Sequence, residues 1–242
     1  MKILALEFSS PQRSVAVVSV AWMDELHESQ TYLATQEPGS RATYPSETRV
    51  SEVIETMPGN TMKPLGMIEE TLQQAGLERE QVDCVAVGIG PGSYAGVRVA
   101  IALAQGWQLA RSVKLLGVSS AECVAAQAQA DGVMGKCSVV IDAQREEFYL
   151  ATYEIAATGL REVEPLKLAT LAEVHGRGKS DGILIGPEVA RWFDGGHVVF
   201  PRAATMGRLA LHRRDFISGE NLEPVYLRET NFVKAPPVRI VP

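Results

Sequence analysis

The chain has 242 residues, of which 46% are hydrophobic and 21% are charged, and its formal net charge at pH 7 is −6. This hydrophobic fraction is enough for one large or two small cores, and the acidic balance argues against a broad basic surface for nucleic acid. No apolar run approaches the ~20 residues of a membrane span, and the first residues do not resemble a signal peptide. The 3 cysteines, without paired spacing, favour a reduced, cytoplasmic setting.

Short apolar runs bounded by polar turns predict the strands of the chain. In chain order these runs cover residues 3–6, 14–20, 30–35, 82–87, 115–118, 138–142, 147–154, 183–185 and 197–200. Helices are predicted where apolar residues recur at spacings of three and four behind a capping residue. They cover residues 61–75, 94–111, 121–130, 171–175 and 204–218. Residues 36–60, rich in proline, glycine and polar residues, are predicted to form a loop with one helical turn.

Both halves of the chain open with a strand, a polar turn and a second strand. This shared opening indicates two related lobes joined near residues 104–112. We assign residues 1–104 to an N-terminal lobe and residues 105–242 to a C-terminal lobe. The helix at residues 204–218 and the tail are expected to pack back on the first lobe.

A glycine-rich turn, GIGPGSYAGVR at residues 88–98, stands between a predicted strand and a predicted helix. Ser93 is a good N-cap for that helix, and the N–H groups of such a turn suit either an anion or a tightly packed neighbour. We favour a rigid turn that directs the helix, with an anion site at Gly90, Gly92, Ser93 and Arg98 as the alternative. A cation in the first turns opposes the helix dipole, so we expect Arg98 to be held by a carboxylate of the chain, by a partner or by an anion.

The helix predicted at residues 94–111 is apolar on every side and unusually rich in alanine and glycine. A helix of this kind is buried all round, and small residues allow another helix to approach closely. The sequence therefore predicts either a central core helix or a helix whose outer side is covered by a partner.

Several segments, in order, resemble motifs of the TsaB (YeaZ) family. They are residues 3–10 (ILALEFSS), the glycine turn, residues 117–120 (GVSS), residues 140–149 (VIDAQREEFY) and residues 223–228 (EPVYLR). The resemblance implies an α/β fold of the two-lobed, actin-like ATPase class (ASKHA, ribonuclease H-like), each lobe a mixed sheet flanked by helices. It also implies a cytoplasmic, non-catalytic subunit required for threonylcarbamoyl modification of adenosine 37 in tRNA.

The partners that the resemblance implies are a catalytic TsaD-like subunit, a TsaE-like ATPase and, in isolation, a second copy of the chain. Transfer RNA would be contacted only indirectly, and no membrane is involved. In the family, the helices equivalent to residues 61–75 and 94–111 form the partner interface. The candidate contacts here are Met62, Leu65, Met67, Val99, Leu103 and Trp107.

The sequence departs from a catalytic or nucleotide-binding pattern at several positions. Glu7 stands where the family usually has aspartate, so Glu7, Ser9, Ser10 and Asp142 are expected to form at most a degenerate nucleotide cleft, without ATP or ADP as a cofactor. None of the 4 histidines lies four residues from another, so the helical metal pair of the catalytic relative is missing. Ser93 also lacks the spacing of a nucleophile elbow.

These departures predict that the chain is not an enzyme, and the glycoprotease-like label sometimes given to the family has no chemical support in it. Two alternatives stay open at this point. One is an ATP-dependent kinase or ATPase of the same fold, and the other is a divergent homodimer with an unrelated role.

Overall fold

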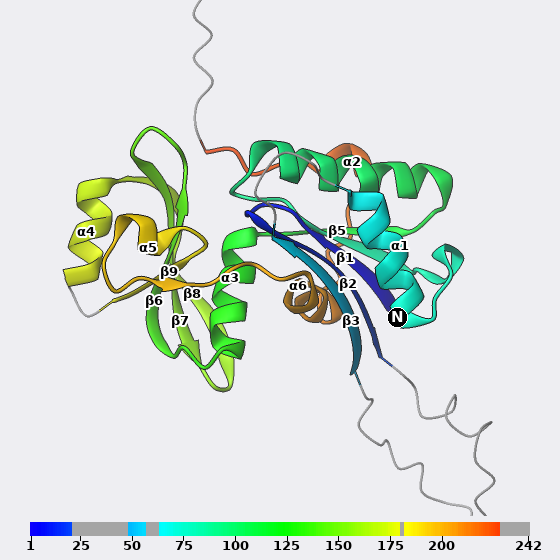
Figure 1. The fold of residues 1–242 in the computed structure, drawn as a ribbon, viewed down its shortest axis with the longest axis horizontal. Coiled ribbons are helices and arrows are strands. Elements are labelled where there is room, and N and C mark those ends of the chain that lie inside the picture. The colour runs from blue at the N-terminus through cyan, green and yellow to red at the C-terminus, as the bar shows by residue number, and fades with distance from the viewer. Residues whose placement is uncertain (21–47, 57–62, 180–181, 228–242) are drawn as a thin grey trace, which may run out of the picture.

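The computed structural model describes residues 1–20, 48–56, 63–179 and 182–227 (Figure 1). The strand predicted at residues 30–35 and the helix caps predicted at Asn60 and Thr61 lie outside the described residues. Among the helices that are described, none is both long enough and apolar enough to cross a membrane.

The first sheet has five strands in the order β3-β2-β1-β4-β5. Its strands are β1 (Lys2–Glu7), β2 (Gln12–Val20), β3 (Thr48–Thr56), β4 (Cys84–Gly88) and β5 (Lys114–Val118). The β1–β2 and β2–β3 pairs are antiparallel, whereas β1–β4 and β4–β5 are parallel. Helices α1 (Pro64–Ala75) and α2 (Tyr94–Ala110) cover one face, and α6 (Ala203–Leu211) covers the other (Figure 1).

The second sheet also has five strands, in the order β10-β9-β6-β7-β8. Its strands are β6 (Gly135–Asp142), β7 (Glu147–Ala156), β8 (Gly159–Thr170), β9 (Ile183–Gly186) and β10 (His197–Val198). Helix α3 (Ser120–Ala130) packs on one face, and α4 (Leu171–Lys179) and α5 (Val189–Trp192) pack on the other. The short helices η2 (Arg79–Gln81) and η3 (Gly219–Asn221) belong to connections. Figure 1 shows α3 and α6 side by side between the two sheets.

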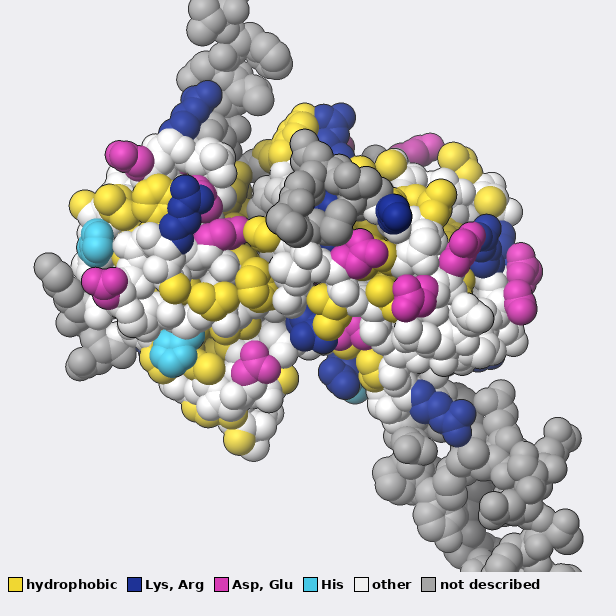
Figure 2. All heavy atoms as spheres, in the orientation of Figure 1, with side chains coloured by type: hydrophobic (Ala, Val, Ile, Leu, Met, Phe, Trp, Pro, Cys, Tyr) yellow, Lys and Arg dark blue, Asp and Glu magenta, His cyan; other side chains and the backbone are white. Residues whose placement is uncertain are grey.

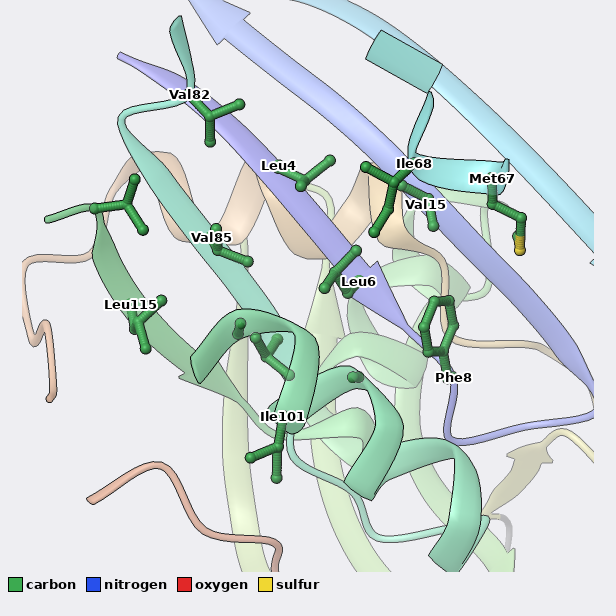
Figure 3. Packing of buried hydrophobic residues seen from close by; sticks show 14 of the residues in the cluster. Leu4, Leu6, Phe8, Val15, Met67, Ile68, Val82, Val85, Ile101 and Leu115 are labelled. Carbon is green, nitrogen blue, oxygen red and sulfur yellow. The ribbon is translucent and has the colours of Figure 1, made fainter. Parts of the chain in front are cut away.

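The central strand β1 is apolar at successive positions because helices bury both of its faces. Leu4 and Leu6 join the core cluster beneath α1 and α2, while Ile3 and Ala5 join the cluster beneath α6. Figure 3 shows the first cluster, to which β1, β2, β4, β5 and both covering helices contribute side chains. Two mixed sheets, each flanked by helices, are the architecture expected from the sequence.

Helix ends follow the predicted signals where the side chains are described. Ser93 caps α2, because its Oγ accepts the N–H of Gly96 at 3.3 Å. Gly76 ends α1 in the left-handed conformation, with a φ of 64°, which glycine adopts without steric cost.

The prediction of a loop at residues 36–60 is wrong for residues 48–56, which form strand β3. This strand pairs with β2 along its whole length, from Gln12 opposite Thr56 to Val20 opposite Thr48. Its own alternation is weak, since two polar residues separate Val50 from Val53, and Ile54 follows Val53 directly. Pairing with a strongly apolar neighbour therefore decides its structure more than its own propensity does. Strand β8 and helix α5 were likewise not predicted.

The helix predicted at residues 204–218 ends at Leu211. The chain then turns so that the Ile217 N–H donates to the Leu115 carbonyl at 3.0 Å, which adds a bridge at the edge of β5. Helix α6 does pack on β1 and β2 of the first sheet.

The division predicted between residues 104 and 105 falls inside α2, which is continuous to Ala110. Residues 114–118 then add β5 to the first sheet, and α3 packs on the second. The change from one sheet to the other therefore follows Val118 rather than residue 104.

Candidate functional site

The glycine turn packs tightly against the segment that follows β1. The Ser93 N–H donates to the Ser9 carbonyl at 2.6 Å. A Cβ on Gly92, whose φ is +145°, would lie 2.2 Å from that same carbonyl oxygen, and a Cβ on Gly96 would lie 2.0 Å from the Phe8 carbonyl oxygen. These glycines are therefore required by close backbone approach within the chain. Of the two groups that such a turn suits, the geometry favours a tightly packed neighbour, the backbone of Phe8 and Ser9, over an anion such as phosphate.

Glu7 lies inside the fold rather than at an open strand end. Its carboxylate accepts the Ser9 N–H at 2.7 Å and the Ser120 hydroxyl at 3.0 Å. A Cβ on Gly88 would lie 2.1 Å from its Oε2, so this glycine makes room for the carboxyl. Burial raises the pKa of Glu7, against the opposing effect of its hydrogen bonds from Ser9 and Ser120. The side chain therefore ties β1 to the start of α3.

Of the other residues of the predicted nucleotide cleft, Ser9 contacts Glu7, whereas Ser10 and Asp142 form their hydrogen bonds elsewhere. Ser9 and Ser10 are buried, and the Ser10 hydroxyl donates to the Gln12 carbonyl at 2.7 Å. Asp142 ends β6 in the second sheet, where it accepts the Gln144 N–H at 2.7 Å. Within the described ranges, no hydrogen bond or ion pair joins Asp142 to Glu7, and no three histidine, cysteine or acidic side chains cluster as metal ligands.

The buried Glu7 makes stability depend on pH with a defined sign. Burial raises the pKa of Glu7 above its ordinary value of 4.5. The folding stability that protonated Glu7 contributes is therefore fully present below pH 4.5, and it is lost as the pH rises through the pKa of the folded state. Glu7→Gln, which cannot ionise, should therefore lose less stability than the wild type as the pH rises above about 4.5. Urea unfolding at several pH values measures this difference. Parallel pH curves for the two proteins would contradict it.

Helix α2 is buried on one side only, which argues against the central core helix and agrees with the alternative of an outer side left open for a partner. Gly96, Val97, Ala100, Ile101 and Ala104 face the core. The opposite side, here called the α2 face, consists of Tyr94, Ala95, Arg98, Ala102, Gly106 and Leu109, all exposed. Leu109 is 90% exposed, and hydrophobic side chains reach the surface along the edge where α2 lies (Figure 2). An apolar helix side left open in this way is a candidate interaction surface.

Two helical glycines on this side of the molecule have no explanation within the chain. A Cβ on Gly106 would meet nothing within 4 Å, and one on Gly66 in α1 would meet only the Lys63 Cβ at 4.0 Å. A glycine inside a helix costs about 1 kcal/mol relative to alanine. Gly176 in α4 is also open, but it lies in the last turn, where a helix ending accounts for it. The open space at Gly66 and Gly106 suits the close approach of a second backbone.

The candidate partner contacts divide into three groups. Leu65 is 60% exposed, and Val99, Leu103 and Trp107 are half-buried, each touching the core beneath α2. Met67 is wrong as a surface contact because it is only 1% exposed, on the side of α1 that faces the sheet. Met62 lies outside the described residues.

The C-terminal tail adds a residue that sequence reasoning did not place near α2. Leu222 is buried in the core beneath α2, and the Val225 N–H donates to the Ile89 carbonyl at 2.8 Å. This route brings the Tyr226 ring to 5.5 Å from the Tyr94 ring, and Figure 1 shows the tail running along α2. In the sequence, the one signal that could have drawn attention to Tyr226 is its position in the EPVYLR motif.

Arg98 lies over the Tyr94 ring, 5.0 Å from its centroid, and donates to the Tyr94 hydroxyl. The expectation that a carboxylate of the chain holds Arg98 is wrong for the described residues, among which no acid forms an ion pair with it. The alternatives predicted from the sequence, a partner or an anion that binds Arg98, stay open.

Comparison with solved structures defines the class of fold. YeaZ from Pseudomonas aeruginosa has a TM-score of 0.68 at 23% identity, covering 93% of this chain and 100% of that one. Another Pseudomonas aeruginosa protein, described as similar to peptidase YEAZ, has a TM-score of 0.71 at 23% identity, covering 94% and 99%. Together with the two mixed sheets, these neighbours define a two-lobed, actin-like α/β fold.

Comparison with known sequences identifies the family. Residues 63–225 match the model of the family described as TsaD: tRNA N6-adenosine threonylcarbamoyltransferase. The TsaB protein of Escherichia coli K12, a tRNA threonylcarbamoyladenosine biosynthesis protein, is 28% identical over 186 residues, which cover 70% of this chain and 80% of the relative. The TsaB protein of Haemophilus influenzae is 34% identical over 109 residues, covering 43% and 44%. The chain belongs to the TsaB (YeaZ) family.

Proposed function

We propose that this chain is the TsaB-type subunit of a tRNA threonylcarbamoyl-modification complex, and that it docks the catalytic TsaD-type subunit on the α2 face. The observation that carries the proposal is the α2 face itself, an exposed, largely apolar helix side with an unexplained glycine, Gly106, toward its C-terminal end. Small residues let two helices pack at short distance, so a helix of the partner fits this surface.

We also propose that the chain self-associates through the same surface in the absence of the catalytic subunit. Helices α1 and α2 lie on the same face of the first sheet, and their exposed sides carry Leu65 and Leu109. A second copy offers the same helices, and an isologous contact then buries both apolar sides at once. The homodimer and the complex with the catalytic subunit would therefore compete for one surface.

We further propose that the chain makes no bond itself and needs no nucleotide, and that a TsaE-type ATPase joins the assembly while tRNA is contacted only indirectly. Two features of the first lobe support this. Glu7, the acid at the end of β1, is fully buried and already holds two hydrogen bonds. The glycine turn is filled by the backbone of Phe8 and Ser9.

Reconstituted threonylcarbamoyl transfer tests the function. With the cognate TsaD-type subunit, the TsaE-type ATPase, a threonylcarbamoyl donor and unmodified tRNA, we expect modification of adenosine to require this chain. The assay measures the modified nucleoside after complete digestion of the tRNA. Equal rates with and without the chain would show that the proposed function is wrong.

A further inference from the structure

Arg98 is held in a defined orientation, but no acidic side chain among the described residues pairs with it. Its guanidinium stacks on the Tyr94 ring, and one of its nitrogens donates to the Tyr94 hydroxyl. Some arginines of the described surface, such as Arg79 and Arg202, pair with the carboxylates of Glu69 and Glu52, whereas Arg208, for example, forms no ion pair there. Arg98 differs from Arg208 because two tyrosines surround its guanidinium. Arg98 also lies in the second turn of α2, where a cation is disfavoured by the helix dipole. An acidic group from outside the chain would offset this cost.

Tyr226 completes a surface around this arginine. Tyr94 is 58% exposed and Tyr226 is 50% exposed, and their rings lie 5.5 Å apart at an interplanar angle of 32°. The tail that carries Tyr226 is anchored by buried Leu222 and by the hydrogen bond from Val225 to Ile89. Tyrosine and arginine dominate the binding energy of protein interfaces, because they present a large, rigid contact area with a polar end.

This surface is continuous with the α2 face. Arg98 stands four residues before Ala102 and eight before Gly106, so the three positions follow one side of the helix. A protein helix that approaches closely at Gly106 therefore passes the Arg98 guanidinium. A carboxylate is the group that matches the paired donors of a guanidinium best.

We propose that Tyr94, Arg98 and Tyr226 bind an aspartate or glutamate side chain of the catalytic subunit docked along α2. This inference rests on the proposed function, and it adds the chemistry of the partner: an acidic side chain next to a helix that packs on Gly106. The bound carboxylate accepts from the outward nitrogens of Arg98 while the two tyrosine rings shield the pair from water.

The test is the affinity of purified wild type and Arg98→Met for the cognate TsaD-type subunit, measured by calorimetry without tRNA or nucleotide. We expect Arg98→Met to weaken binding about 10-fold or more. The dependence of affinity on NaCl between about 50 and 300 mM should also become shallower, because one screened charge pair is lost. Tyr226→Ala should weaken binding in the same direction. Arg208→Met, at an exposed arginine of α6 on the other face of the sheet, is the matched control and should change neither quantity.

Each contrary outcome has a distinct meaning. If the wild type binds and Arg98→Met binds with equal affinity and equal salt dependence, the carboxylate proposal is wrong and the proposed function stands. If Arg98→Met binds normally but the assembled complex retains tRNA less well, the anion is an RNA phosphate, which also overturns the proposal. If the wild type itself does not bind the catalytic subunit, both the inference and the proposed function are wrong.

Discussion

Gly96→Ala is expected to destabilise the fold by about 3 kcal/mol or more, whereas Gly106→Ala in the same helix is expected to stabilise it by up to about 1 kcal/mol. The added methyl at residue 96 would lie 2.0 Å from the Phe8 carbonyl oxygen, so that β1 and α2 must move apart. The methyl at residue 106 would meet nothing within 4 Å and only removes the entropic cost of glycine. Urea unfolding of the three proteins at one pH measures both effects.

The comparison is informative because the two substitutions share their chemistry and their helix. It should be made at a protein concentration at which the wild type is monomeric, so that loss of a dimer does not enter the unfolding free energy. Destabilisation at both positions would mean that Gly106 serves the chain's own fold. The argument for a partner at that position would then be lost.

Gly106→Glu is expected to leave the monomer folded and at least as stable as the wild type, yet to abolish its assembly with a partner. Glutamate is a good helix former, and the isolated chain offers open space at this position. In a complex, the same side chain would stand where a second backbone approaches. A carboxylate buried there without a counter-charge costs several kcal/mol, enough to reduce affinity more than 100-fold.

Ala172→Glu provides the matched control for that variant. Ala172 is an exposed position of α4, on the second sheet and away from α2. The Ala172→Glu substitution adds the same charge and the same side chain to a helix surface. It therefore controls for net charge and for general effects on solubility. We expect Ala172→Glu to assemble as the wild type does. Equal loss of assembly in both variants would show that charge alone, and not the α2 face, is responsible.

The elements around the glycine turn could be predicted because their signals are local. Ser93 caps α2 and Gly76 ends α1, each through its own side chain or backbone freedom. The apolar run of β1 likewise reports burial on both faces. Strand β3 could not be found in this way, because its weak alternation becomes a strand only through pairing with β2.

The candidate site was predicted only in part, because it depends on the directions of side chains and on contacts distant in sequence. Exposed Leu65 and buried Met67 are only two residues apart on α1, about half a helical turn. Spacing alone did not establish which side of the helix faces the sheet. Tyr226 reaches Tyr94 only because the tail is anchored beside β4 and β5. The open space at Gly106 becomes visible only once the neighbouring atoms are placed.

Light scattering after size exclusion tests most directly whether a partner covers the α2 face. Wild type, Gly106→Glu and Ala172→Glu are each measured alone and mixed with the cognate TsaD-type subunit. We predict that wild type and Ala172→Glu form a complex of both subunits, whereas Gly106→Glu elutes as a folded monomer in both conditions. A complex of Gly106→Glu with the same mass and yield as that of the wild type would contradict the account.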